Sequence, residues 1–163
     1  MTSGAEASES RQLHPLAALL GGTLVIGSLD MAYAIAFWAM RGVAPIRIFQ
    51  SVAAGLLGSD AARGGGMRTA LLGAALHYFI AFSIVLVYWI ASRALPLLIQ
   101  RPVLCGAAYG LIVYGVMNYV VIPLSNARKG GGFLLSWFVC SLIVHAFLIG
   151  VPAALFARAA RAR

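Results

Sequence analysis

Residues 16–40 read LAALLGGTLVIGSLDMAYAIAFWAM, an apolar run interrupted by a single carboxylate, Asp30. At about 1.5 Å per residue, a helix of this length crosses the ~30 Å hydrocarbon layer of a bilayer. An ionisable side chain inside lipid costs roughly 3 kcal/mol on insertion scales, so it normally faces a partner or a wet cavity. The run therefore predicts a membrane span whose acid faces the protein interior. A cleaved signal peptide fits less well, because the run is too long, carries Asp30 and lacks a strongly basic start.

The composition is that of a membrane protein. Of the 163 residues, 62% are hydrophobic and only 10% are charged, which is too little polar chemistry to cover a soluble domain of this size. The formal net charge is +8, but the basic residues stand between the apolar runs or near the chain ends, as anchors for lipid headgroups do. No basic and aromatic surface motif accompanies them. We expect the lipid bilayer as a partner and no nucleic acid.

Three further apolar runs follow the first, at residues 70–92, 102–121 and 133–156. Together the four runs predict an all-α, polytopic four-helix bundle, a single transmembrane domain over residues 14–157. A disordered tail is expected at 1–13 and a basic tail at 158–163. Pro152 predicts a kink in the fourth span.

The connection after the first span has a helical pattern of its own. Apolar side chains recur at helical spacing over residues 45–57, with Pro45 suited to a first helical turn and Gly58 to a helix end. Arg47, Gln50 and Ser51 fall on the opposite, polar face. The pattern predicts an amphipathic helix in the membrane interface. It is either a lid over a cavity mouth or, as we favour, a connector, and a flexible turn at 63–66 follows it.

Each predicted span carries one polar candidate in its interior, and these are Asp30, His77, Asn118 and His145. Counting along antiparallel helices places them roughly 15, 10, 7 and 18 Å from the same membrane surface. Polar groups in lipid seek one another because water is absent. We therefore expect one intramembrane polar cluster. Arg47, Gln50, Tyr114 and Ser141 are secondary candidates.

A structural role competes with a functional one at every position. Asn118 is typical of an interhelical hydrogen bond, and a single membrane histidine such as His145 is typical of packing. Asp30 and His77 are the favoured functional pair, since an acid in lipid needs a cation, a proton or donors, and an imidazole supplies any of these.

Transport of a proton or a small solute is the function we favour, with Asp30 and His77 titrating and with Tyr114 and Asn118 orienting water or substrate. The alternative is a structural or assembly subunit that meets a second copy or another membrane protein through the small face of Gly106 and Gly110.

Enzymatic and cofactor functions fit less well. Haem ligation by His77 and His145 is disfavoured because their depths differ by roughly 7.5 Å. A hydrolase using Ser141 and His145 is disfavoured because nothing identifies an oxyanion hole. We expect no enzyme, no catalytic residue, no metal and no cofactor.

Several short motifs recur together along the chain: GSLD at 27–30, QSVAAGLLG at 50–58, GAALH at 73–77 with IAF at 80–82, and YG at 109–110 with MN at 117–118 and PLS at 123–125. In this combination the chain resembles a family of small bacterial four-span membrane proteins of unknown function. The resemblance implies a multi-pass protein of the inner (cytoplasmic) membrane and carries no catalytic role.

The orientation in the membrane is not decided by charge. Six basic residues fall on each side of the predicted bundle, and the positive-inside rule depends on a bias between the sides. Because three arginines crowd the last six residues, at 158, 161 and 163, we expect both termini in the cytoplasm.

Overall fold

The computed structural model describes residues 14–127 and 132–161. The tail predicted at 1–13 and the last two residues of the basic tail lie outside the described residues. Within the described ranges every regular element is a helix, which confirms the all-α prediction.

Four helical segments are long and apolar enough to cross a membrane. The first two are unbroken helices, α1 (Pro15–Ala39) and α4 (Gly66–Ala94). The other two each contain a π-helical turn, and their parts are α6 (Pro102–Val116), η1 (Met117–Val121) and α7 (Ile122–Leu124), then α8 (Leu135–Val144), η2 (His145–Gly150) and α9 (Val151–Ala159). The single turn α5 (Leu97–Gln100) joins the second span to the third.

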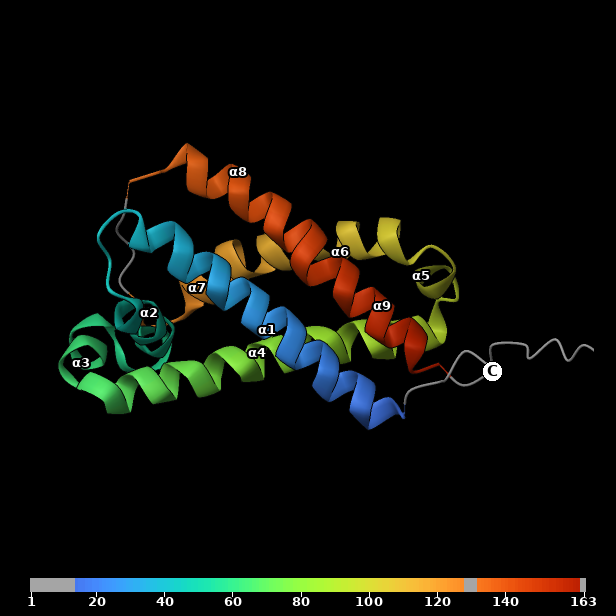
Figure 1. The fold of residues 1–163 in the computed structure, drawn as a ribbon, viewed down its shortest axis with the longest axis horizontal. Helices are drawn as coiled ribbons and strands as arrows, with labels where there is room; N and C mark the ends of the chain where they lie inside the picture. Colours follow the sequence, from blue (N-terminus) through green and yellow to red (C-terminus); the bar gives the residue numbers. More distant parts are fainter. Residues whose placement is uncertain (1–13, 128–131, 162–163) are drawn as a thin grey trace, which may run out of the picture.

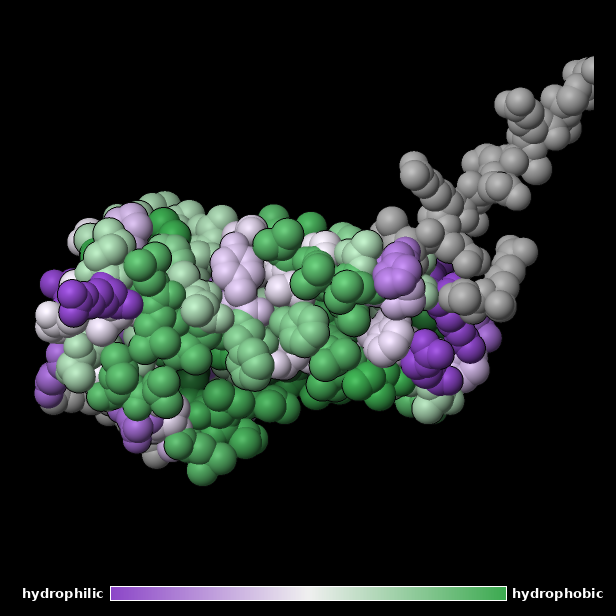
Figure 2. Space-filling view, turned by 90° about the horizontal axis from the view of Figure 1, so that it is seen from below, coloured by the Kyte–Doolittle hydropathy of each residue, from purple (hydrophilic) through white to green (hydrophobic). Residues whose placement is uncertain are grey.

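The surface agrees with a membrane setting. Figure 2 shows a largely hydrophobic middle between hydrophilic groups at the two ends of the molecule. Among the described residues, every charged side chain except Asp30 belongs to a segment at one of these ends, and the arginines concerned are Arg41, Arg47, Arg63 and Arg68 at one end and Arg93, Arg101, Arg158 and Arg161 at the other. Helix α1 begins and α9 ends at the same end of the bundle (Figure 1).

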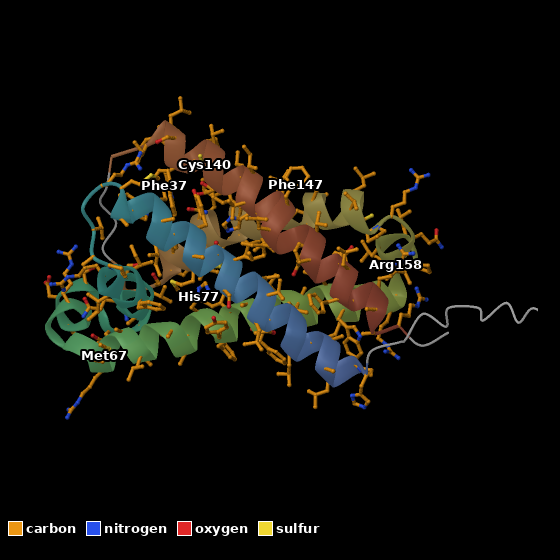
Figure 3. The ribbon with its side chains drawn as sticks, in the orientation of Figure 1. Phe37, Met67, His77, Cys140, Phe147 and Arg158 are labelled. Carbon is orange, nitrogen blue, oxygen red and sulfur yellow. The ribbon has the colours of Figure 1, made fainter. Side chains whose placement is uncertain are left out.

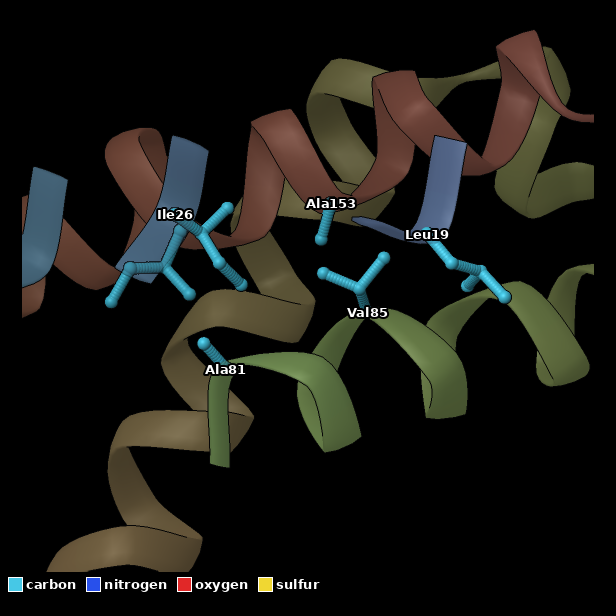
Figure 4. Packing of buried hydrophobic residues seen from close by; sticks show 6 residues of the cluster. Leu19, Ile26, Ala81, Val85 and Ala153 are labelled. Atoms are coloured by element: carbon cyan, nitrogen blue, oxygen red, sulfur yellow. The ribbon is translucent and has the colours of Figure 1, made fainter. Parts of the chain in front are cut away.

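The second half of the fourth span is the centre of the bundle. Helix α9 packs against α1, α4 and α6, whereas α8 makes few contacts with α1 and α6 and leans away from the others (Figure 1). The buried residues between α1, α4 and the fourth span form one hydrophobic core: Leu19, Ile26, Ala81, Val85, Ile149 and Ala153 (Figure 4). The bundle is therefore tightly closed near the termini and opens toward the other end.

Glycines bring the third and fourth spans into backbone contact. A methyl group on Gly110 would overlap the carbonyl oxygen of His145, and one on Gly150 would overlap the carbonyl oxygen of Gly106. The small face predicted at Gly106 and Gly110 is thus a packing surface, but its partner is the fourth span of the same chain. Both glycines are buried in this contact.

Helix α2 (Pro45–Leu57) occupies the end of the bundle opposite the termini (Figure 1). It begins at Pro45 as predicted and stops at Gly58, whose φ of +82° is readily adopted only by glycine. Its backbone presses on α4, because a methyl group on Gly73 would overlap the carbonyl oxygen of Phe49. Asn126 also fixes the end of α2, through its backbone N–H to the oxygen of Gly55 (2.9 Å).

Gln50 was predicted to lie on the polar face of α2, and this prediction was wrong. A short helix, α3 (Ser59–Gly64), follows α2 in place of the flexible turn expected at 63–66. Gln50 lies where α2 meets the start of α4 and is only 2% exposed. The amide nitrogen of Gln50 donates to the carbonyl oxygen of Gly66 (3.0 Å), and its oxygen accepts from Arg47 (2.9 Å). The buried amide is stable because both of its ends are bonded.

Candidate functional site

A cavity of about 330 Å³ lies inside the bundle where α8 diverges from the other spans. Its lining comes from all four spans and from α2. Ile26, Ala81 and Ile149 belong both to its lining and to the buried hydrophobic core, and they close it on the side of the termini. On the opposite side its lining includes Ser51 and Ile122, which are exposed. The cavity therefore faces the end of the molecule that carries α2.

All four polar candidates line this one cavity: Asp30 from α1, His77 from α4, Asn118 from η1 and His145 from η2. Each is half-buried, and Figure 3 shows His77 between α1 and α4. The secondary candidates Tyr114 and Ser141 line it as well. The structure thus gathers one ionisable or amide side chain from every span around a common space.

His77 is held by the first span. Its Nε2 lies 2.8 Å from the carbonyl oxygen of Gly27, one turn before Asp30. Because a carbonyl oxygen only accepts, Nε2 is the donor. A neutral His77 therefore keeps Nδ1 as an acceptor. Within the described chain, Asp30 and His77 form neither a hydrogen bond nor an ion pair, so any coupling between them acts across the cavity.

Asn118 and His145 are oriented in the same way by their own helices. The amide nitrogen of Asn118 donates to the carbonyl oxygen of Tyr114 (2.9 Å), and Nδ1 of His145 donates to that of Ser141 (2.9 Å). Each bond reaches back one helical turn. The amide oxygen of Asn118 and Nε2 of a neutral His145 remain as acceptors.

The two π-helical turns place these residues at the cavity. In η1 the N–H of Ile122 bonds to the oxygen of Met117, and in η2 the N–H of Val151 bonds to that of Ala146, five residues back in both cases. Pro123 and Pro152 follow directly. A proline ring clashes with the carbonyl four residues earlier and lacks an N–H, and a wider turn relieves both defects. At Pro152, where a kink was predicted, the structure has this π-helical turn directly before the proline.

The π turn at Asn118 was not predicted from the sequence. The available signal was the pairing of a polar residue with a proline shortly after it in an apolar run, and it occurs in both spans. Single π turns inside α-helices are frequent at functional sites.

Asp30 is the one formally charged side chain among the described residues that line the cavity. It lies within electrostatic range of Tyr33 and His145, but in the described ranges nothing donates a hydrogen bond to it. No fully buried side-chain nitrogen or oxygen of the described residues lacks a hydrogen-bond partner. The carboxylate oxygens are therefore not sealed in protein, and they face accessible space.

An aromatic wall on the side of α8 was not foreseen. Tyr33 stacks on Trp137, with ring centroids 5.1 Å apart and planes 10° from parallel. The Tyr33 hydroxyl shares a 2.9 Å hydrogen bond with Ser141, and Phe37 packs edge-on against Trp137 at 4.8 Å. The sequence signal was the spacing of aromatic residues by one turn near the end of the first span. These contacts tie α1 to the diverging helix α8.

Arg47 and Gln50, the remaining secondary candidates, do not line the cavity. Arg47 donates to Gln50 and to the carbonyl oxygen of Arg63 (3.3 Å). Their position is the corner between α2, α3 and α4, where they stabilise the end of the bundle. Helix α2 itself contributes Ser51, Val52 and Gly55 to the cavity wall, so it is more than a connector.

The chain has four apolar helices of spanning length, charged residues at both ends and polar side chains around an internal cavity. Together these features define a multi-pass membrane protein. No protein-family model, curated protein or solved structure matches the chain. Within the described residues, no group of three or more histidine, cysteine or acidic side chains is arranged to hold a metal ion.

Proposed function

We propose that the protein transports a proton or a small solute across the bacterial inner membrane, with Asp30 as the residue that binds it. The carrying observation is the carboxylate of Asp30, which no described residue pairs with, in a cavity that all four spans line. A charged group deep in a bundle is costly to insert, and neither an ion pair nor a hydrogen bond to a described residue offsets that cost.

The shape of the cavity supports the same proposal. The layer of Ile26, Ala81 and Ile149 separates the cavity from the end of the bundle that holds the termini. Transport requires this layer to part while the opposite side closes, and a one-sided cavity is one of the two states that such a cycle needs. With both termini in the cytoplasm, the described state opens outward.

Proton flux into liposomes tests the proposal. Purified protein is reconstituted with a pH-sensitive dye inside, and a potassium diffusion potential drives proton entry. We expect acidification with the wild type, the rate of empty liposomes with Asp30→Asn, and the wild-type rate with Asp60→Asn, an exposed acid outside the cavity. Equal proton flux in wild type and Asp30→Asn contradicts the role of Asp30. If the wild type itself moves no protons, a solute-exchange assay in the same liposomes tests whether the protein transports a small solute.

A further inference from the structure

The hydrogen-bonding groups left free in the cavity are mostly acceptors. They are the two oxygens of Asp30, the amide oxygen of Asn118, Nδ1 of His77 and Nε2 of His145, the last two in the neutral imidazole form. The Tyr33 and Ser141 hydroxyls are bonded to each other. Among the described lining residues, the donors left over are fewer: the indole N–H of Trp137, the second amide N–H of Asn118 and the Tyr114 hydroxyl. A ligand that matches this inventory donates hydrogen bonds.

The charge of the lining favours a cation. Asp30 is its single formal charge, and an opposite charge on the ligand compensates an acid in a low-dielectric setting. The nearby arginines are engaged elsewhere: Arg47 with Gln50, and Arg41 with Ser136 (3.1 Å) and over the ring of Phe37 (3.9 Å). No lysine or arginine among the described residues lines the cavity.

The size and the walls favour an organic ligand over a bare ion. The volume of about 330 Å³ equals that of roughly ten water molecules, far more than one inorganic ion fills. Much of the remaining lining is apolar, including Ile80, Ile84 and Val113, and the stacked rings of Tyr33 and Trp137 stand on the side of α8. A hard metal ion prefers a shell of oxygen ligands, whereas these walls suit a hydrocarbon group.

We propose that the cavity binds a small organic ammonium ion, with its N–H groups on Asp30 and Asn118 and its apolar group against the isoleucines and the Tyr33–Trp137 stack. This rests on the proposed function and names the solute class for it. Such an amphiphilic amine partitions into the membrane interface, close to the cavity mouth at α2, so the basic residues at this end do not bar its approach.

Calorimetric titration of the purified protein tests this inference with three probes of one shape: benzylammonium, benzyl alcohol and benzoate, each corrected for binding to empty micelles. We expect benzylammonium to bind the wild type at least tenfold more tightly than the other two. Asp30→Asn should weaken benzylammonium at least tenfold and leave benzyl alcohol unchanged, and Asp60→Asn should leave all three unchanged.

The comparison of probes needs only the wild-type protein, so it holds even if a variant fails to fold. Benzoate or benzyl alcohol binding as tightly as benzylammonium overturns the inference, and so does undiminished benzylammonium binding by a folded Asp30→Asn variant. Selective amine binding without liposome flux upholds the ligand class and refutes transport. Proton flux without amine binding refutes the ligand class and upholds transport.

Discussion

The contact between the third and fourth spans at Gly110 gives the sharpest test of the fold. A methyl group at Gly110 would overlap the carbonyl oxygen of His145, which is backbone and does not rotate away. Non-bonded atoms prefer separations of about 3.5 Å, so Gly110→Ala must push the two helices apart by roughly an ångström or more. Overpacking of this kind costs about 1–3 kcal/mol, a change of roughly five- to 150-fold in the unfolding equilibrium.

The same helix provides the matched control. A methyl group at Gly115 meets nothing within 4 Å, so Gly115→Ala should keep the stability or raise it by up to about 1 kcal/mol through helix propensity. Unfolding of both variants in mixed micelles with increasing sodium dodecyl sulfate, followed by circular dichroism, measures the difference. If Gly110→Ala is as stable as Gly115→Ala, the backbone contact between the spans is not as described.

Three further perturbations test other contacts. Tyr33→Phe removes the hydrogen bond to Ser141 and should lower the unfolding free energy by about 0.6 kcal/mol, a typical membrane hydrogen bond; an unchanged value would count against the bond. Gln50→Leu removes two hydrogen bonds, from the amide nitrogen to Gly66 and from Arg47 to the amide oxygen, and at about 0.5–1.5 kcal/mol each should destabilise the protein by about 1–3 kcal/mol; a neutral result in thermal unfolding would show that these bonds do not stabilise the corner. Gly73→Ala should loosen α2 from α4, seen as faster amide hydrogen exchange over residues 45–57, and unaltered exchange would refute the close packing.

The cavity shows which steps of sequence reasoning have a physical basis. Depth along a helix follows from a constant rise per residue, so counting residues was enough to expect Asp30, His77, Asn118 and His145 in one layer of the bundle. Direction around the helix axis was harder. The extra residue of a π turn rotates all later side chains around the helix axis by the angle of one residue. Asn118 and His145 lie within the π turns η1 and η2 themselves.

The sequence by itself determined the class of the protein, the four spans and the limits of α2, because hydrophobic length, proline and glycine act locally along the chain. Only the tertiary structure decided the partners. It bonds His77 to Gly27 in place of Asp30, buries Gln50 where α2 meets α4, and turns the small face of Gly106 and Gly110 toward the fourth span of the same chain. Such pairings depend on how separate helices approach one another in space, and residue spacing within one helix carries no information about that.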